Sequence, residues 1–367
     1  MTYASTGVKY DVLDTFKRDA QRAARETAGN IARLGFRVLE ESYGESAFLF
    51  EPTDDIPYTS AHVEEGLGTK NLVADVMYRL TNKSYYDQIA QCTVAMIVND
   101  LITLGALPLS VAMHVAVGTS DWFNDEKRSG DLIAGWKNAC NLARCAWGGG
   151  ETPTLRGIVV PETVLLSGSA TGVIKKPMSR LILGDTIQHS DRIVIIESSG
   201  IHANALTLAR KIADNLPEGY LTKLSDGRTY GETLLDPTHI YVGLVEDCLN
   251  SGVDIHYAVN ITGHGWRKLM RATQSFAYVI DTLPTQLPIF DFIQQYGPVD
   301  DVEAYGNLNM GAGFALYVEE DDVNVVIDIA GELNLGAFVA GHIEKGEKKV
   351  IIKPKGLEYA AETLAVR

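Results

Sequence analysis

The chain has 367 residues and a formal net charge of −15, with 46% hydrophobic and 22% charged residues. This length allows two domains with separate hydrophobic cores, and the composition is ordinary for a soluble globular protein. The acidic balance argues against a nucleic-acid partner, because contacts with a phosphate backbone need clustered Lys and Arg. A phosphorylated ligand would therefore need local help from a metal ion, a lysine or a helix N-terminus.

The cysteines indicate the compartment. Cys92, Cys140, Cys145 and Cys248 form no CxxC pair and no zinc spacing. We predict that they are small buried hydrophobic residues in a reducing environment. Residues 9–18 are too polar for a secretory signal peptide. We therefore expect a cytoplasmic protein.

In chain order, the first half alternates helices and strands. An amphipathic helix precedes two short strands and a glycine turn. A long helix, a strand, a second helix, a glycine-rich stretch and a last strand follow. The expected ranges are 10–34 (helix), 47–50 and 58–63 (strands), 65–70 (turn), 86–104 (helix), 109–117 (strand), 133–146 (helix), 148–152 (glycine-rich) and 162–171 (strand).

Residues 94–118 are mostly apolar and suggest an alternative, a membrane-spanning helix. However, Asn99 and Asp100 lie within this stretch, and Pro108 and His114 follow them. Each is costly or disruptive in a helix that faces lipid. We therefore expect a buried helix, a turn and a core strand here, and no membrane partner.

The chain turns polar over residues 175–180, and this predicts a boundary between domains 1–174 and 175–367. Alternating helices and strands favour an α/β (α+β) fold. No GxGxxG follows the first strand, which argues against a Rossmann dinucleotide-binding fold. No GxxxxGK[ST] motif is present, which argues against a P-loop nucleotide site. In the second half we expect a strand over 192–196, helices from 203 and over 237–251, and a strand over 314–318.

The turn over residues 197–204 is a candidate ligand site. It joins the β-branched strand 192–196 to the helix expected from residue 203, and it contains His202 and Asn204. Small residues let a backbone approach a ligand, and the free N–H groups of a helix start attract anions. Two interpretations carry equal weight: a site for a phosphorylated substrate, or a tight βα turn with a serine cap.

Four carboxylates lie beside turns or in apolar and glycine-rich segments: Glu64, Glu65, Asp100 and Glu151. Taken singly, a buried Asp is more simply a hydrogen-bonded residue, and Glu64 a solvated surface charge. Mg²⁺ prefers oxygen ligands and often bridges few carboxylates to substrate phosphates. Together with the glycine turns, the carboxylates favour a magnesium site.

Seven ordered motifs give a more specific indication: 65–70 (EGLGTK), 98–101 (VNDL), 149–152 (GGET), 198–204 (SSGIHAN), 235–238 (LDPT), 261–263 (ITG) and 309–313 (NMGAG). This set resembles the phosphoribosylformylglycinamidine cyclo-ligase (AIR synthetase, PurM) family, from about residue 5 to residue 343. The resemblance implies a two-domain PurM-like fold. Its N-terminal ferredoxin-like α/β half would form a dimer barrel in a homodimer, and a C-terminal α/β half would follow.

The resemblance also implies a reaction and its residues. ATP would phosphorylate the amide oxygen of formylglycinamidine ribonucleotide, and a neighbouring amine would close the imidazole ring and expel phosphate. The implied roles are Mg²⁺ binding by Glu65, Asp100 and Glu151; ATP binding by Gly66, Gly68, Thr69, Lys70, Asn99, Gly149 and Gly150; substrate binding by Ser199, Gly200, Asn260 and Thr262; and catalysis by Lys70, His202, Asn204 and His264.

The chain departs from the family pattern at three places. Glu65 stands where the family usually has aspartate, and NITGHG over 260–265 replaces HITGGG, so that His264 follows Asn260. Residues 40–48 keep one glycine and carry three acidic residues. Two rivals therefore stay open: a paralogue that phosphorylates another small molecule, and a non-catalytic PurM-like subunit.

Overall fold

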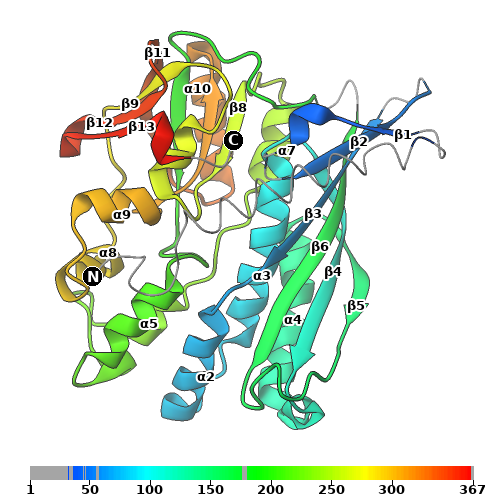
Figure 1. Cartoon of the computed structure of the whole chain (residues 1–367), viewed down its shortest axis with the longest axis vertical. Coiled ribbons are helices and arrows are strands. Elements are labelled where there is room, and N and C mark those ends of the chain that lie inside the picture. Colours follow the sequence, from blue (N-terminus) through cyan, green and yellow to red (C-terminus); the bar gives the residue numbers. More distant parts are fainter. Residues whose placement is uncertain are drawn as a thin grey trace.

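The computed structural model describes residues 32, 36–43, 45, 47–54, 58–175 and 180–364. The helix expected over 10–34 falls almost entirely outside these residues, as do parts of the 40–48 and 175–180 stretches. Two β-sheets with associated helices make up the fold (Figure 1), which confirms the mixed α/β class. The division near residue 175 stays a prediction.

The first sheet has the strand order β1-β2-β3-β6-β4-β5. All neighbouring strands are antiparallel except β4 and β5, which are parallel. Its strands are β1 (Phe36–Val38), β2 (Phe48–Pro52), β3 (Tyr58–Gly66), β4 (Leu107–Val117), β5 (Ala146–Glu151) and β6 (Val164–Lys175), and the helices of this half are η3 (Glu40–Ser42), α2 (Lys70–Thr81), α3 (Tyr86–Ile102), η4 (Ser120–Asn124) and α4 (Glu126–Leu142).

Helix α3 packs on β3, β6 and β4, and α4 packs on α3 and β5. The contact between α3 and β6 is close. A Cβ on Gly168 would lie 2.9 Å from Ile97 Cδ1, and a Cβ on Gly172 would lie 3.4 Å from Leu101 Cδ1. This identifies the face of the sheet that carries Gly168 and Gly172 as the one that α3 covers.

The opposite face of the first sheet carries alternate residues of the same strands. Phe48 pairs with His62 across β2 and β3, and Tyr58 lies four residues before His62 on β3, so it is on the same face. Phe48, Tyr58 and Leu165 of this face are all exposed. The first sheet is therefore covered by helices on one side and presents apolar side chains on the other.

The second sheet has the order β13-β12-β9-β11-β7-β10-β8, with only the β12–β9 pair parallel. Helix α10 packs on β7 and β11, and η6 packs on β8, β9 and β12. The strands are β7 (Arg192–Glu197), β8 (Tyr257–Asn260), β9 (Phe276–Ile280), β10 (Ala312–Val318), β11 (Ala337–Lys345), β12 (Lys349–Ile352) and β13 (Leu357–Ala360), and the helices are α5 (Leu206–Asp214), η5 (Gly219–Leu221), α6 (Tyr230–Leu234), α7 (Val242–Asn250), η6 (Gly265–Met270), α8 (Pro288–Tyr296), α9 (Asp301–Asn307), η7 (Glu320–Asp322), α10 (Val323–Glu332), η8 (Lys353–Lys355) and η9 (Ala361–Thr363).

The apolar runs were predicted well. The strand over 192–196 is β7, the helix over 86–104 is α3, and the strands over 109–117 and 314–318 are β4 and β10. In the described part of the chain, no helix is both long and apolar enough to cross a membrane. The stretch from residue 94 to residue 118 is thus a buried helix and a core strand.

Several element boundaries were wrong. The helix expected from residue 203 begins at Leu206, because His202 and Ala205 adopt positive φ angles in the preceding turn. The helix over 133–146 is α4, which begins at Glu126, where the Asp125 side chain caps its start. It ends at Leu142, before Arg144 with φ +52°.

Two more corrections concern residues 148–152 and residues 237–251. The glycine-rich stretch 148–152 is largely strand β5. Gly150 permits the pairing with β4, because a Cβ there would lie 2.1 Å from the Met113 carbonyl oxygen. The helix over 237–251 is the shorter α7.

Candidate functional site

Helix α3 contacts the first sheet on one side and the second half of the chain on another. Gln91 Nε2 donates to the Thr238 carbonyl at 2.9 Å. Two helical turns later, Asn99 Nδ2 donates to the His239 carbonyl at 2.8 Å, and Asn99 Oδ1 accepts from the Tyr241 N–H at 3.0 Å. Eight residues correspond to about two turns of an α-helix, so these amides lie along one side of α3. We call this line of contacts the α3 seam.

Lys70 is the first residue of α2, and its side chain is fully buried. Its Nζ donates to the carbonyl oxygens of His202 at 2.8 Å and Asp236 at 2.6 Å. A buried ammonium is stable only when its donors are paired, and both partners here belong to the second half. The structure thus gives Lys70 a joining role, while its predicted contact with ATP phosphates stays a prediction.

A polar cluster lies where the end of α3 meets the end of β8. Asn260 Nδ2 donates to Asp100 Oδ1 at 2.7 Å, and these two residues are only 4% and 8% exposed. Lys268 Nζ donates to the Asn260 carbonyl at 3.2 Å and to Thr262 Oγ1 at 2.5 Å. We call Asp100, Asn260, Thr262 and Lys268 the Asp100 cluster. It places a carboxylate, an amide, a hydroxyl and an ammonium within one connected network.

The 198–204 turn is held by the last of the seven motifs. Asn309 Oδ1 accepts from the Ser198 hydroxyl at 3.2 Å, and Asn309 Nδ2 donates to the Gly200 carbonyl at 2.9 Å. The Ser199 hydroxyl donates to the Pro237 carbonyl at 2.5 Å. Two motifs far apart in sequence therefore meet, and the predicted substrate residues Ser199 and Gly200 use these groups to fix the turn.

His202 is buried in this turn with φ +59°. Its Nε2 accepts from the Ser199 N–H at 3.2 Å, so the neutral ring carries its proton on Nδ1. Burial first, and then electrostatic repulsion from His239 and Lys70, hold the pKa of His202 well below its usual value of 6.5. The side chain is therefore a neutral donor and acceptor at neutral pH.

The loop after β8 contacts the same turn. Asn204 Oδ1 accepts from the Gly263 N–H at 3.1 Å. His264 is buried with φ +67°, and its carbonyl accepts from the Arg267 N–H at 3.2 Å. The structure thus brings the predicted residues Asn204, Asn260, Thr262 and His264 together around residues 260–265.

The glycine motifs do not form one phosphate loop. Gly66 ends β3, and Gly68 with φ +76° and Thr69 form the turn before α2. Gly149 and Gly150 lie on β5. Strands β6 and β4 separate β3 from β5, so the two motifs are three strand spacings apart, roughly 14 Å.

Within the single chain, Glu65 and Glu151 lie on opposite faces of the first sheet, and Mg²⁺ binding by Glu65, Asp100 and Glu151 stays a prediction. Across the sheet Glu65 aligns with Gly168, whereas Glu151 aligns with His114 and Ser167 in the adjacent row. Adjacent rows point to opposite faces, so Glu65 lies on the α3 side and Glu151 on the other. In the described residues, no group of three or more His, Cys, Asp or Glu side chains could hold a metal ion.

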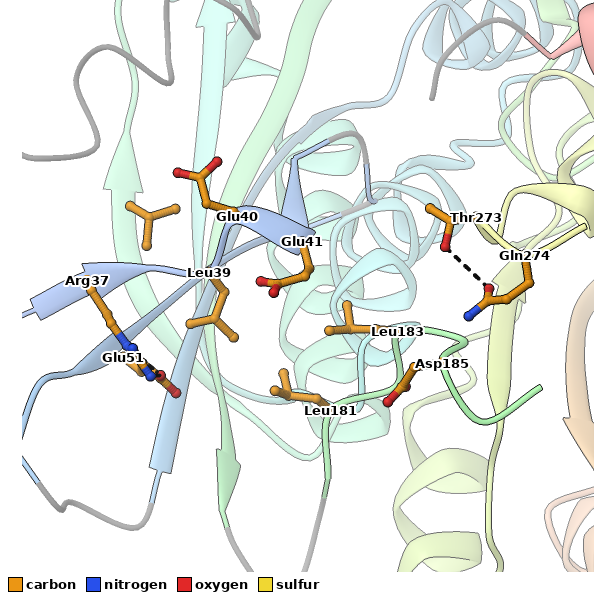
Figure 2. A pocket seen from close by; sticks show the side chains of 11 residues that line it. Arg37, Leu39, Glu40, Glu41, Glu51, Leu181, Leu183, Asp185, Thr273 and Gln274 are labelled. Carbon is orange, nitrogen blue, oxygen red and sulfur yellow. Dashed lines mark hydrogen bonds and ion pairs between the residues drawn. The ribbon is translucent and has the colours of Figure 1, made fainter. Parts of the chain in front are cut away.

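A separate hollow of about 710 Å³ lies between the first strands and the segment that leads to the second sheet. Figure 2 shows Leu181 and Leu183 on the wall of this hollow, near the carboxylates of Glu41 and Asp185. Its lining also includes Glu51, which pairs with Arg37 at 2.5 Å. Carboxylates outnumber cations in this lining, which disfavours an anionic ligand, so we do not assign the phosphorylated substrate to this hollow.

Sequence reasoning missed three residues of this region, Lys268, His239 and Tyr241, and it missed the role of the Asp236 carbonyl. Lys268 reaches Thr262 only because η6 folds the chain back after Gly265. Tyr241 donates to the Glu197 carbonyl at 2.9 Å, beneath the 198–204 turn. The motif 235–238 was noticed, but nothing in its residue types indicated that its backbone carbonyls would receive Lys70.

The chain belongs to the AIR synthase related protein family. Residues 65–174 match the N-terminal domain of that family, and residues 188–353 match its C-terminal domain. Together the two matches cover most of the sequence and leave a short connection between them. This confirms the family resemblance of the seven motifs.

Among curated proteins, the chain is similar to phosphoribosylformylglycinamidine cyclo-ligases. It is 38% identical to that of Methanocaldococcus jannaschii over 72% of this chain and 73% of the relative. It is 37% identical to that of Carboxydothermus hydrogenoformans over 89% of this chain and 91% of the relative. These alignments extend well beyond the separate motifs.

Solved structures share the fold at lower identity. Thiamine-monophosphate kinase from Stenotrophomonas maltophilia matches with a TM-score of 0.59 and 19% identity, over 84% of this chain and 90% of that one. PurL of T. maritima, solved in complex with ATP, matches with a TM-score of 0.53 and 14% identity, over 84% of this chain and 44% of that one. At these identities the likeness concerns the fold, which is the PurM-like fold expected from the motifs.

Proposed function

We propose that this chain is an ATP-dependent cyclo-ligase that converts formylglycinamidine ribonucleotide to aminoimidazole ribonucleotide, a step of purine biosynthesis. The observation that carries the proposal is the 37% identity to a phosphoribosylformylglycinamidine cyclo-ligase over 89% of the chain. ATP would phosphorylate the amide oxygen to an iminophosphate. The neighbouring amine would then attack the carbon of the iminophosphate, close the imidazole ring and expel phosphate.

The α3 seam and the Asp100 cluster support this proposal. Ring closure needs the amine held against the activated carbon and donors near the leaving phosphate. The Lys268 ammonium and the Asn204 amide would supply such donors, and Asp100 would orient the Asn260 amide through their 2.7 Å hydrogen bond. His202 would act as a neutral hydrogen-bonding group, because burial lowers its pKa.

Magnesium is part of the proposal as the usual companion of ATP. Mg²⁺ commonly takes one or two carboxylates, with phosphates and water completing its shell. Because Glu65 and Glu151 lie on opposite faces of the first sheet in the single chain, we assign no catalytic step to the ion. The predicted ATP contacts at Gly66, Gly68, Thr69, Gly149 and Gly150 also belong to the proposal.

We further propose a cytoplasmic homodimer of two-domain subunits divided near residue 175. The first sheet supports the dimer, since its helix-free face exposes Phe48, Tyr58 and Leu165. Exposed apolar residues gathered on one face are typical of an interaction surface. A second copy would cover this face without disturbing the α3 seam on the other side.

The test is an assay of ADP release with ATP, Mg²⁺ and formylglycinamidine ribonucleotide, coupled to detection of aminoimidazole ribonucleotide. Asp100→Asn is assayed beside the wild type and is expected to lower kcat by about 10²-fold. Asp328→Asn is the matched control, because Asp328 also lies on a helix, α10, but is exposed. The control is expected to keep wild-type activity.

The possible outcomes separate the proposal from its rivals. Substrate-dependent ADP release that yields the imidazole product supports the cyclo-ligase. No turnover, with ATP still raising the melting temperature, would favour a paralogue that phosphorylates another small molecule. No turnover and no effect of ATP would favour a non-catalytic subunit.

A further inference from the structure

Two of the four cysteines, Cys140 and Cys145, lie at the C-terminal end of helix α4. Helix α4 stops at Leu142, and Arg144 follows in the left-handed region with φ +52°. The Cys145 N–H donates to the Cys140 carbonyl at 3.0 Å, and the Arg144 N–H donates to the Asn141 carbonyl at 3.1 Å. This is the Schellman arrangement, in which the residue after the left-handed position folds back on the third residue from the helix end.

The Schellman arrangement brings the two thiols together. In this motif the side chains at the two positions held by Cys140 and Cys145 commonly make contact. A backbone hydrogen bond between two residues also draws their Cα atoms into the range of separations that a disulfide needs. Cys140 is 3% exposed, while Cys145 is half-buried and reachable from solvent. The arrangement therefore pairs one accessible thiol with one protected thiol.

From this placement we propose that Cys140 and Cys145 form a reversible dithiol–disulfide pair that reacts with small disulfides. Cys145 is the attacking thiol, since the hydrogen bond from Cys140 lowers the pKa of Cys145. Cys140 is the resolving thiol, and the same hydrogen bond and burial raise its pKa. The other two cysteines, Cys92 and Cys248, are fully buried and stay outside the pair.

The reaction is an ordinary thiol–disulfide exchange. The Cys145 thiolate attacks one sulfur of the small disulfide, forms a mixed disulfide and releases the first thiolate. The Cys140 sulfur then attacks Cys145, and its proton passes to the second departing thiolate. In sum, the two protein thiols are oxidised to a disulfide, and the small disulfide is reduced to two thiols.

The pair also connects to the junction between the two halves. Arg144, between the two cysteines, donates to Glu246 at 2.7 Å and to Asp247 at 2.5 and 2.8 Å, both on α7. A disulfide would hold the turn and thereby keep Arg144 directed at α7. The proposal is independent of the proposed catalytic activity.

The test uses 2-hydroxyethyl disulfide, a small uncharged probe, on the full chain under native conditions. Intact mass is followed by alkylation of the remaining thiols in denaturant and by peptide mapping. We expect a product lighter by two hydrogen atoms, with Cys140 and Cys145 linked, Cys92 and Cys248 alkylated, and full reversal by dithiothreitol. Four alkylated thiols in the wild type, or a stable mixed adduct on Cys145, would overturn the proposal.

Variants assign the two roles. Cys140→Ser is expected to stop at the mixed disulfide on Cys145, and Cys145→Ser is expected to form neither product. Cys248→Ala is the matched control and keeps the disulfide. If a variant does not fold, the wild-type peptide map alone still decides, because it identifies which two sulfurs are joined.

Discussion

The α3 seam and the edge strand β5 carry predicted site residues of similar kinds, but their surroundings differ. In the Asp100 cluster, which adjoins the α3 seam, Asp100 is 8% exposed and hydrogen-bonded to Asn260 from the other half of the chain. On β5, Glu151 is exposed and accepts a hydrogen bond from the neighbouring Thr152 N–H at 3.2 Å. The seam residues are fixed by each other before any ligand binds, whereas Glu151 is free to follow a ligand. We therefore expect substitutions near α3 to change both stability and activity, and substitutions on β5 to change activity alone.

Removing the Lys70 ammonium should lower the free energy of unfolding more than any other substitution considered below. Lys70→Met leaves two buried carbonyls without their donor, so we expect a loss of about 3 kcal/mol in the free energy of unfolding. Lys137→Met is the matched control on an exposed site of α4 and should change stability by less than about 0.5 kcal/mol. Urea denaturation measures both. A loss in Lys70→Met as small as in the control would show that Lys70 does not join the halves.

The second largest loss of stability is expected from overpacking beneath the 198–204 turn. A Cβ on Gly313 would lie 1.8 Å from Tyr241 Oη and 2.9 Å from His202 Cε1. Gly313→Ala should therefore cost about 2 kcal/mol through overpacking. Gly331→Ala, near the end of α10, has no neighbour within 4 Å of the added carbon and should be neutral or slightly stabilising. Thermal unfolding of both variants would contradict the argument if Gly313→Ala melted like Gly331→Ala.

The seam also shows what the sequence could and could not predict. Strand β7 and helix α3 were found because their apolar runs depend on residue type alone. The partners of Lys70 could not be found, since they are backbone carbonyls, which every residue has. Nor could sequence spacing place Glu65 and Glu151 on opposite faces, because that depends on the pairing of β3, β6, β4 and β5. Motifs identified the family and two seam residues, Asn99 and Thr238, but the register decided which residues meet.

The buried histidine of the 198–204 turn, His202, predicts a pH dependence. The pKa of His202 is lower in the folded chain than the ordinary 6.5, so above pH 6.5 it is neutral in both states. Below pH 6.5 the unfolded chain binds a proton that the folded chain does not, and stability falls by up to about 1.4 kcal/mol per pH unit. His202→Gln should reduce this slope in urea titrations between pH 7 and 5.5. His189→Gln, at an exposed site, should leave the slope as in the wild type.

Glu151→Gln should have the smallest effect on stability and so gives the sharpest test of the edge strand. The side chain is exposed, and an amide can still accept from the Thr152 N–H, so the free energy of unfolding should change by less than about 0.5 kcal/mol. If β5 meets ATP as proposed, the variant should raise KM for ATP while it melts like the wild type. Asp100→Asn, in the Asp100 cluster, alters a buried hydrogen bond and should change both stability and kinetics. Unchanged kinetics in Glu151→Gln would remove β5 from the candidate site and leave the α3 seam to carry it.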